Sequence, residues 1–60
     1  MQITRLSKDN YKIICCEIEF TVQKHDYSSN WIVDNRDFHI HHLCTDLSEA
    51  IDYIDFIMLV

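Results

Sequence analysis

The stretch TDLSEAIDYIDFIMLV, residues 45–60, decides the fold because it carries a clear helical period at the end of the chain. At about 100° per residue, its apolar side chains fall into one stripe. The stripe contains Leu47, Ala50, Ile51, Ile54, Ile57 and Met58, with Tyr53 and Val60 at its edge. Thr45 is a candidate N-cap, and Asp46 with Glu49 has the spacing of a capping box. The sequence predicts an amphipathic helix over about residues 46–59.

The other side of this helix carries acids without a base. Residues 45–60 contain four acidic and no basic side chains, so they hold −4 of the formal net charge of −5. Phe56 and Leu59 also fall on this polar side, away from the apolar stripe. Three of the acids recur every three residues, about 4.5 Å apart along the helix axis: Glu49, Asp52 and Asp55. An aromatic ring among carboxylates indicates a surface that contacts a partner.

Upstream of the helix the sequence favours antiparallel strands. The longest run of β type spans residues 11–24, where apolar and polar side chains alternate with a period of two. Its apolar face is expected to contain Ile14, Cys16, Ile18, Phe20 and Val22. Shorter strands are predicted at about residues 2–6, 31–34 and 38–42. We expect one α+β domain, residues 1–60, in which a sheet of three or four antiparallel strands packs against the C-terminal helix.

The composition excludes several kinds of active site. The chain has no glycine, so it cannot form a P-loop, a dinucleotide fingerprint, an EF-hand loop or a nucleophile elbow. Glu17 and Glu19 have the spacing of paired carboxylates, but a chain of 60 residues can hardly enclose a pocket that buries a substrate. Cys16 is expected in the core and Cys15 on the opposite face, in a setting that would not activate a thiol. We predict a protein without enzyme activity.

The sequence also indicates where the protein acts. Three cysteines, two of them adjacent, imply no disulfide framework and suit a reducing compartment. Residues 1–10 lack the apolar segment of a signal peptide, and no apolar run approaches the roughly 20 residues of a membrane span. We expect a cytoplasmic protein that does not associate with membranes.

The histidines form the one cluster with metal-ligand residue types. On a strand, His39 and His41 would share a face and could hold zinc together with Cys44 or His25. A structural zinc site usually has two close-spaced ligand pairs, and the second pair is missing. The favoured interpretation is therefore a polar strand surface, with Phe38 and Ile40 as its buried half, and no metal or cofactor. A metal-binding or pH-responsive module that uses His39, His41 and His42 is the alternative.

Nucleic acid is an unfavourable partner for so acidic a chain. Arg5, Lys8 and Lys12 could gather at one edge of the sheet, which would suit a small DNA-binding regulator. Five basic residues in a chain of net charge −5 nevertheless make a weak phosphate-binding face. The converse hypothesis is that the acidic helix imitates nucleic acid and attracts a basic groove. Partner-binding residues would then be Glu49, Asp52, Asp55 and Phe56.

A second apolar surface suggests self-association. A chain this short has a small core, and a twofold dimer could bury the apolar end of the helix. The expected dimer interface contains Tyr53, Phe56, Leu59 and Val60. Small size, concentrated acidity and a composition rich in Ile, Asp and Tyr together favour an inhibitor encoded by a phage or mobile element. Its expected role is to bind and block a host protein.

Overall fold

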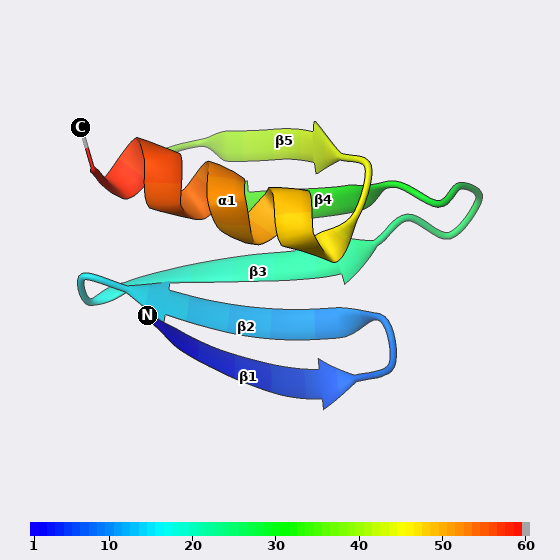
Figure 1. Cartoon of the computed structure of the whole chain (residues 1–60), viewed down its shortest axis with the longest axis horizontal. Coiled ribbons are helices and arrows are strands. Elements are labelled where there is room, and N and C mark those ends of the chain that lie inside the picture. Colours follow the sequence, from blue (N-terminus) through cyan, green and yellow to red (C-terminus); the bar gives the residue numbers. More distant parts are fainter. Residues whose placement is uncertain (60) are drawn as a thin grey trace.

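The computed structural model describes residues 1–59 and contains five strands followed by one helix (Figure 1). The elements are β1 (Gln2–Ser7), β2 (Asn10–Cys15), β3 (Ile18–Lys24), β4 (Trp31–Asn35), β5 (Ile40–Cys44) and α1 (Leu47–Met58). The strands lie in the sheet in chain order, and every neighbouring pair is antiparallel. The α+β fold is therefore confirmed, with five strands in place of the three or four expected.

The additional strand arises from a tight turn that the sequence pattern does not predict. Cys16 and Glu17 have positive φ values of 55° and 69°, as both central residues of a type I′ turn do. The turn brings Cys15 opposite Ile18 and divides the predicted strand 11–24 into β2 and β3. Such turns usually contain Asn-Gly or Asp-Gly, so the prediction of one continuous strand was wrong. Cys16 lies exposed in the turn and not in the core.

This turn also changes which side chains share a face of the sheet. Ile13 of β2 lies opposite Phe20 of β3, and both are fully buried beneath α1. Because side chains alternate along a strand, Ile14 points to the other face, where it lies opposite Glu19. The expected apolar row through Ile14 and Cys16 therefore does not exist. Cys15 contributes to the core in place of Cys16.

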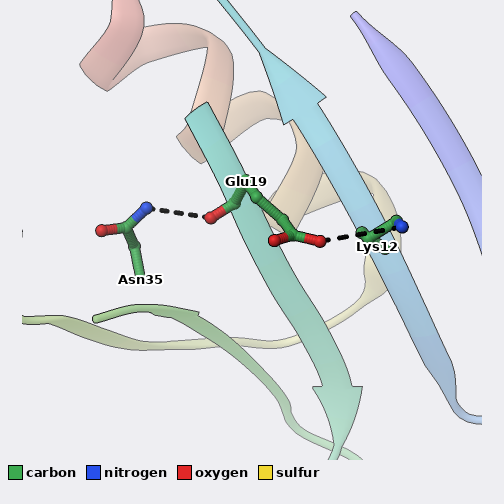
Figure 2. A network of polar contacts seen from close by, with 3 residues as sticks. All are labelled: Lys12, Glu19 and Asn35. Atoms are coloured by element: carbon green, nitrogen blue, oxygen red, sulfur yellow. Dashed lines mark hydrogen bonds and ion pairs between the residues drawn. The ribbon is translucent and has the colours of Figure 1, made fainter. Parts of the chain in front are cut away.

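The connection between β4 and β5 depends on the side chain of Asn35. Its amide oxygen accepts a hydrogen bond from the Phe38 backbone N–H at 2.8 Å. Its amide nitrogen donates to the Glu19 carbonyl at 2.9 Å, so the side chain joins the loop to β3 (Figure 2). His39 adopts a φ of 55°, and β5 consequently begins at residue 40 and not at 38. The expectation that Phe38 is buried was wrong, because it lies in this loop and is exposed.

The helix begins within the predicted range, with Asp46 and not Thr45 as its N-cap. The Asp46 carboxylate accepts a hydrogen bond from the Glu49 backbone N–H at 2.8 Å, and the Thr45 hydroxyl donates to the Glu49 carboxylate. The first contact satisfies a backbone donor that would otherwise be unpaired at the start of the helix, and the second joins two side chains beside it. Ala50 and Ile54 are fully buried, which confirms the centre of the apolar stripe.

The molecule has two layers, and they cover the sheet unequally. Helix α1 packs against β2, β4 and β5, and in Figure 1 it lies in front of the half of the sheet that ends at β5. Strand β1 lies at the opposite edge, and all six of its residues are exposed. The buried core lies between α1 and the central strands and contains Ile13, Phe20, Val22, Val33, Cys44, Ala50 and Ile54.

Candidate interaction surfaces

The outer face of α1 contains the residues predicted to bind a partner. We define the outer helix face as the exposed residues Glu49, Asp52, Asp55, Phe56 and Leu59. Phe56 is 68% exposed and Leu59 is 86% exposed, although both are large apolar side chains. The helical period places Phe56 one turn beyond Asp52, so the ring lies beside that carboxylate. The face is thus acidic from Glu49 to Asp55 and apolar at Phe56 and Leu59.

Tyr53 differs from the other residues of the expected dimer interface. It is half-buried, and its ring stacks on His42 of β5 with centroids 3.9 Å apart and planes inclined by 5°. This contact joins α1 to β5 and gives Tyr53 a partner within the chain. Phe56 and Leu59 remain available at the surface. Val60 lies outside the described residues.

The charges on the outer helix face are unevenly placed with respect to the helix dipole. Acids near the N-terminus of a helix are favourable, and Asp46 and Glu49 occupy that end. Asp55 lies in the last turn, where the dipole is negative and no basic residue is present. The ion pairs found within residues 1–59 join Lys12 to Glu19 and His41 to Asp34, so none of them neutralises the helix. A cationic partner would find these carboxylates without counter-ions.

A second polar surface lies on the face of the sheet that α1 does not cover. It is a broad hollow of about 770 Å³ that is open to solvent. It lies at the end of the sheet where β3 and β5 begin and β4 ends. The strand register places Asp34 opposite His41, and the Asp34 carboxylate lies 2.7 Å from the His41 Nδ1 atom. At its edge the Glu19 carboxylate is 3.7 Å from the Lys12 ammonium (Figure 2). The hollow is too open to exclude water from a bound small molecule.

The structure does not assemble the metal ligands considered from the sequence. His39 lies in the loop before β5, His41 points to the uncovered face of the sheet, and Cys44 is buried on the helix side. Burial raises the pKa of the Cys44 thiol, and the nearby charges of Glu49 and Asp46 raise it further. Within residues 1–59, no three His, Cys, Asp or Glu side chains are grouped so that they could hold a metal ion.

The remaining histidines also lie apart from this set. His25 is in the loop after β3, where its Nδ1 atom accepts a hydrogen bond from the Tyr27 backbone N–H at 3.2 Å. His42 faces the helix and stacks on Tyr53. The close spacing of His39, His41, His42 and Cys44 in sequence was therefore a poor guide to their spacing in the fold.

The basic residues considered for DNA binding do not form one patch. Arg5 lies opposite Tyr11 on the helix side of the sheet, and its Nε atom donates to the Ser7 carbonyl at 3.2 Å. Lys12 points to the opposite face, where it lies beside Glu19. Lys8 is in the turn between β1 and β2. The sheet therefore separates charges that the sequence places within eight residues.

No family model, curated protein or solved structure matches this chain. In the described part of the chain, no helix has the length and apolar character needed to cross a bilayer.

Sequence reasoning identified the outer helix face but missed the hollow on the sheet. The residues of the helix face are close in sequence and follow one period. The hollow depends on the register of β4 and β5, which pairs Asp34 with His41 across a loop of irregular length. The polar residues Asp34 and His41 directly follow the apolar residues Val33 and Ile40, and this alternation is the one signal that could have indicated an uncovered polar face.

Proposed function

We propose that this protein acts by binding another protein through the outer helix face. The observation that supports this proposal best is Phe56, an aromatic ring that is 68% exposed beside carboxylates without counter-ions. Aromatic side chains commonly provide much of the affinity of a protein interface. The partner surface that fits this arrangement is a basic groove with an apolar pocket.

The proposed mechanism is competitive blocking. Carboxylates at Glu49, Asp52 and Asp55 would attract a basic groove over a distance and raise the rate of association. Burial of Phe56 would then slow dissociation, since an anchored aromatic residue mainly affects the off-rate. In this way the helix would occupy a site that normally holds nucleic acid. A cytoplasmic host protein blocked by a phage or mobile-element product is the proposed biological setting.

The test compares capture of host proteins by the wild type and by a doubly neutral variant. Asp52→Asn/Asp55→Asn should lose the captured partner at physiological salt. A matched control, Asp9→Asn/Asp26→Asn, changes the net charge equally at two exposed residues outside α1 and should retain the partner. Duplex DNA added to the wild-type complex should release the partner. Equal retention by the two double variants would refute the role of the helix charges.

The apolar anchor is tested separately. Phe56→Ser should weaken binding of the captured partner by about 30-fold, the equivalent of a hot spot of about 2 kcal/mol. Calorimetry or surface plasmon resonance with the purified partner measures this effect. An unchanged affinity in Phe56→Ser would contradict the anchoring role even if the charge variants behave as expected.

A second copy of the chain is the competing occupant of this face. A twofold contact through Phe56 and Leu59 would bury both side chains, but it would also bring Asp52 and Asp55 of each copy together. We therefore expect self-association to strengthen as salt screens this repulsion. Sedimentation at low and high salt tests the expectation, with Phe56→Asp as the variant that should remain monomeric. A wild type that is monomeric at both salt concentrations would rule out the dimer.

A further inference from the structure

Strand β1 forms an open edge of the sheet. Within residues 1–59 it pairs with β2 alone, so the backbone N–H and C=O groups that point away from β2 have no neighbouring strand. Natural sheets usually block such an edge with proline, charged side chains or a bulge. In β1, proline is absent, Arg5 is the one charged residue, and the register with β2 is regular from Gln2 to Arg5. The edge is therefore able to pair with a further strand.

We propose that β1 pairs with β1 of a second copy of this chain, in antiparallel orientation about a twofold axis that passes beside Ile3. The two sheets then join into one. Ile3 points to the helix side of the sheet, because it lies opposite the buried Ile13, and it is 47% exposed. The pairing places the two Ile3 side chains opposite each other, which removes apolar surface from water in both copies.

The other side chains of β1 are compatible with this register. Gln2 of each copy lies opposite Thr4 of the other, so a polar pair forms on the face that α1 does not cover. The two Arg5 residues lie about 14 Å apart along the strands, which exceeds the Debye length of about 8 Å. Each Arg5 Nε atom donates to the Ser7 carbonyl, farther from the axis. A register centred on Thr4 would bring the Arg5 residues to about 7 Å, where like charges repel.

The distribution of charge favours β1 over the other edge of the sheet. Two copies of net charge −5 repel each other, and four of the acids lie in residues 45–60. Helix α1 lies in front of the half of the sheet that ends at β5, and β1 lies at the opposite edge (Figure 1). Strands lie about 4.8 Å apart, so pairing through β1 keeps the two helices about 25–30 Å apart. Pairing through β5 would bring the acidic helices together.

The pairing is weak and leaves the outer helix face free. One short strand buries less than the roughly 800 Å² per partner of a standard interface, so we expect a dissociation constant of about 0.1–1 mM. In dilute solution β1 therefore remains an unpaired edge. The axis is perpendicular to the sheet, so both helices lie on the same side of the joined sheet. The dimer would present two outer helix faces to a partner that has two binding sites.

The first test measures amide hydrogen exchange and translational diffusion by NMR at about 0.05 mM and about 2 mM protein. Exchange of the outward-pointing β1 amides occurs from the monomer, whose share falls as concentration rises. These amides should therefore exchange about two- to fourfold more slowly in the concentrated sample, and diffusion should slow as well. The amides of β5 should not change. Exchange in β1 that is independent of concentration, or protection of β5 in its place, would overturn the proposal.

A pair of charge variants tests the contact at the axis. Ile3→Lys places two ammonium groups opposite each other and should abolish the concentration dependence. It makes the net charge less negative, so general repulsion between copies falls and cannot explain the loss. Gln23→Lys makes the same change of charge at an exposed position of β3 and should pair like the wild type. Circular dichroism checks that both variants are folded. An equal effect of the two substitutions would contradict pairing through β1.

Disulfide cross-linking tests the register. Residues directly opposite each other in antiparallel strands have Cα atoms about 4.5–5.5 Å apart, within reach of a disulfide, so Ile3→Cys should cross-link two copies on mild oxidation. Thr4→Cys is the control, because its Cα atoms would lie about 8 Å apart, beyond that reach. Both variants are made with Cys16→Asn, which removes the exposed thiol and tolerates positive φ. Equal cross-linking of the two variants on a non-reducing gel would overturn pairing centred on Ile3.

Discussion

The half of the sheet under α1 and the outer strand β1 differ sharply in how they are held. Phe20, Val22 and Val33 are fully buried under the helix, whereas Ile3 in β1 is 47% exposed. A helix is about 10–12 Å wide and strands lie about 4.8 Å apart, so one helix covers two or three strands of a sheet. Five strands exceed that width. Hydrophobic burial therefore stabilises the covered half, while β1 depends mainly on backbone pairing with β2.

The largest expected effect is at the centre of the covered half. Ile54→Ala should lower the free energy of unfolding by about 2–5 kcal/mol, because it removes fully buried methyl groups and leaves a cavity. For a chain of this length, such a loss would leave much of the protein unfolded. Urea denaturation followed by circular dichroism measures the change. Leu59→Ala, at an exposed position, is the control; a similar loss in both variants would contradict the comparison.

The second-largest effect on stability is expected at the N-terminus of α1, the helix that covers half of the sheet. Asp46→Ala removes the acceptor for the Glu49 N–H and should cost about 1 kcal/mol. Asp46→Ser keeps an N-cap acceptor and should restore most of the loss. Thermal unfolding of the three proteins checks this order. Equal stability of Asp46→Ala and the wild type would mean that packing alone fixes the start of α1.

The helix and the first hairpins differ in how well the sequence predicts them. The cap and the apolar stripe of α1 depend on residues within one or two turns of each other, so their pattern is local, and it placed the stripe correctly and the N-cap to within one residue. The turn at Cys16 and Glu17 is held by pairing of β2 with β3, which forces φ values that these residues rarely adopt. Period-two alternation continues through it, so the pattern hides the turn.

The candidate surfaces also differ in how well the sequence predicts them. Exposure of Phe56 and Leu59 follows from the helical period, and the structure confirms it. The placement of His39, His41 and Cys44 depends on where β5 begins, which the side chain of Asn35 determines through hydrogen bonds to Phe38 in the same loop and to Glu19 in β3. The contact with Glu19 joins residues far apart in sequence, so it has no signature in a local pattern. The same holds for the pairing of Asp34 with His41.

A stabilising substitution at the turn between β2 and β3 would sharpen the comparison. Glu17→Gly should raise the free energy of unfolding by about 0.5–1 kcal/mol, because a residue other than glycine at positive φ carries steric strain. The gain is reduced by the greater freedom that glycine gives to the unfolded chain. Chemical denaturation measures it, and Glu19→Gly, within β3, should instead be destabilising. Destabilisation by Glu17→Gly would contradict the turn geometry.

The smallest effect is expected in β1. Ile3→Thr keeps a β-branched side chain on a half-exposed strand and should change the free energy of unfolding by less than about 0.5 kcal/mol. Hydrogen exchange should show the amides of β1 exchanging faster than those of β3 and β4. A loss above about 1.5 kcal/mol in Ile3→Thr would show that β1 belongs to the same cooperative core as the covered strands.

The order of the strands has a consequence for how the chain folds. Each strand pairs only with its neighbours in sequence, so every loop that must close is short. Short loops give a low contact order, and such proteins fold quickly even when they contain a sheet. The sequence has no proline, so refolding lacks the phase of tens of seconds that isomerisation of prolyl bonds imposes. Folding of this chain is therefore expected to proceed without a slow isomerisation step.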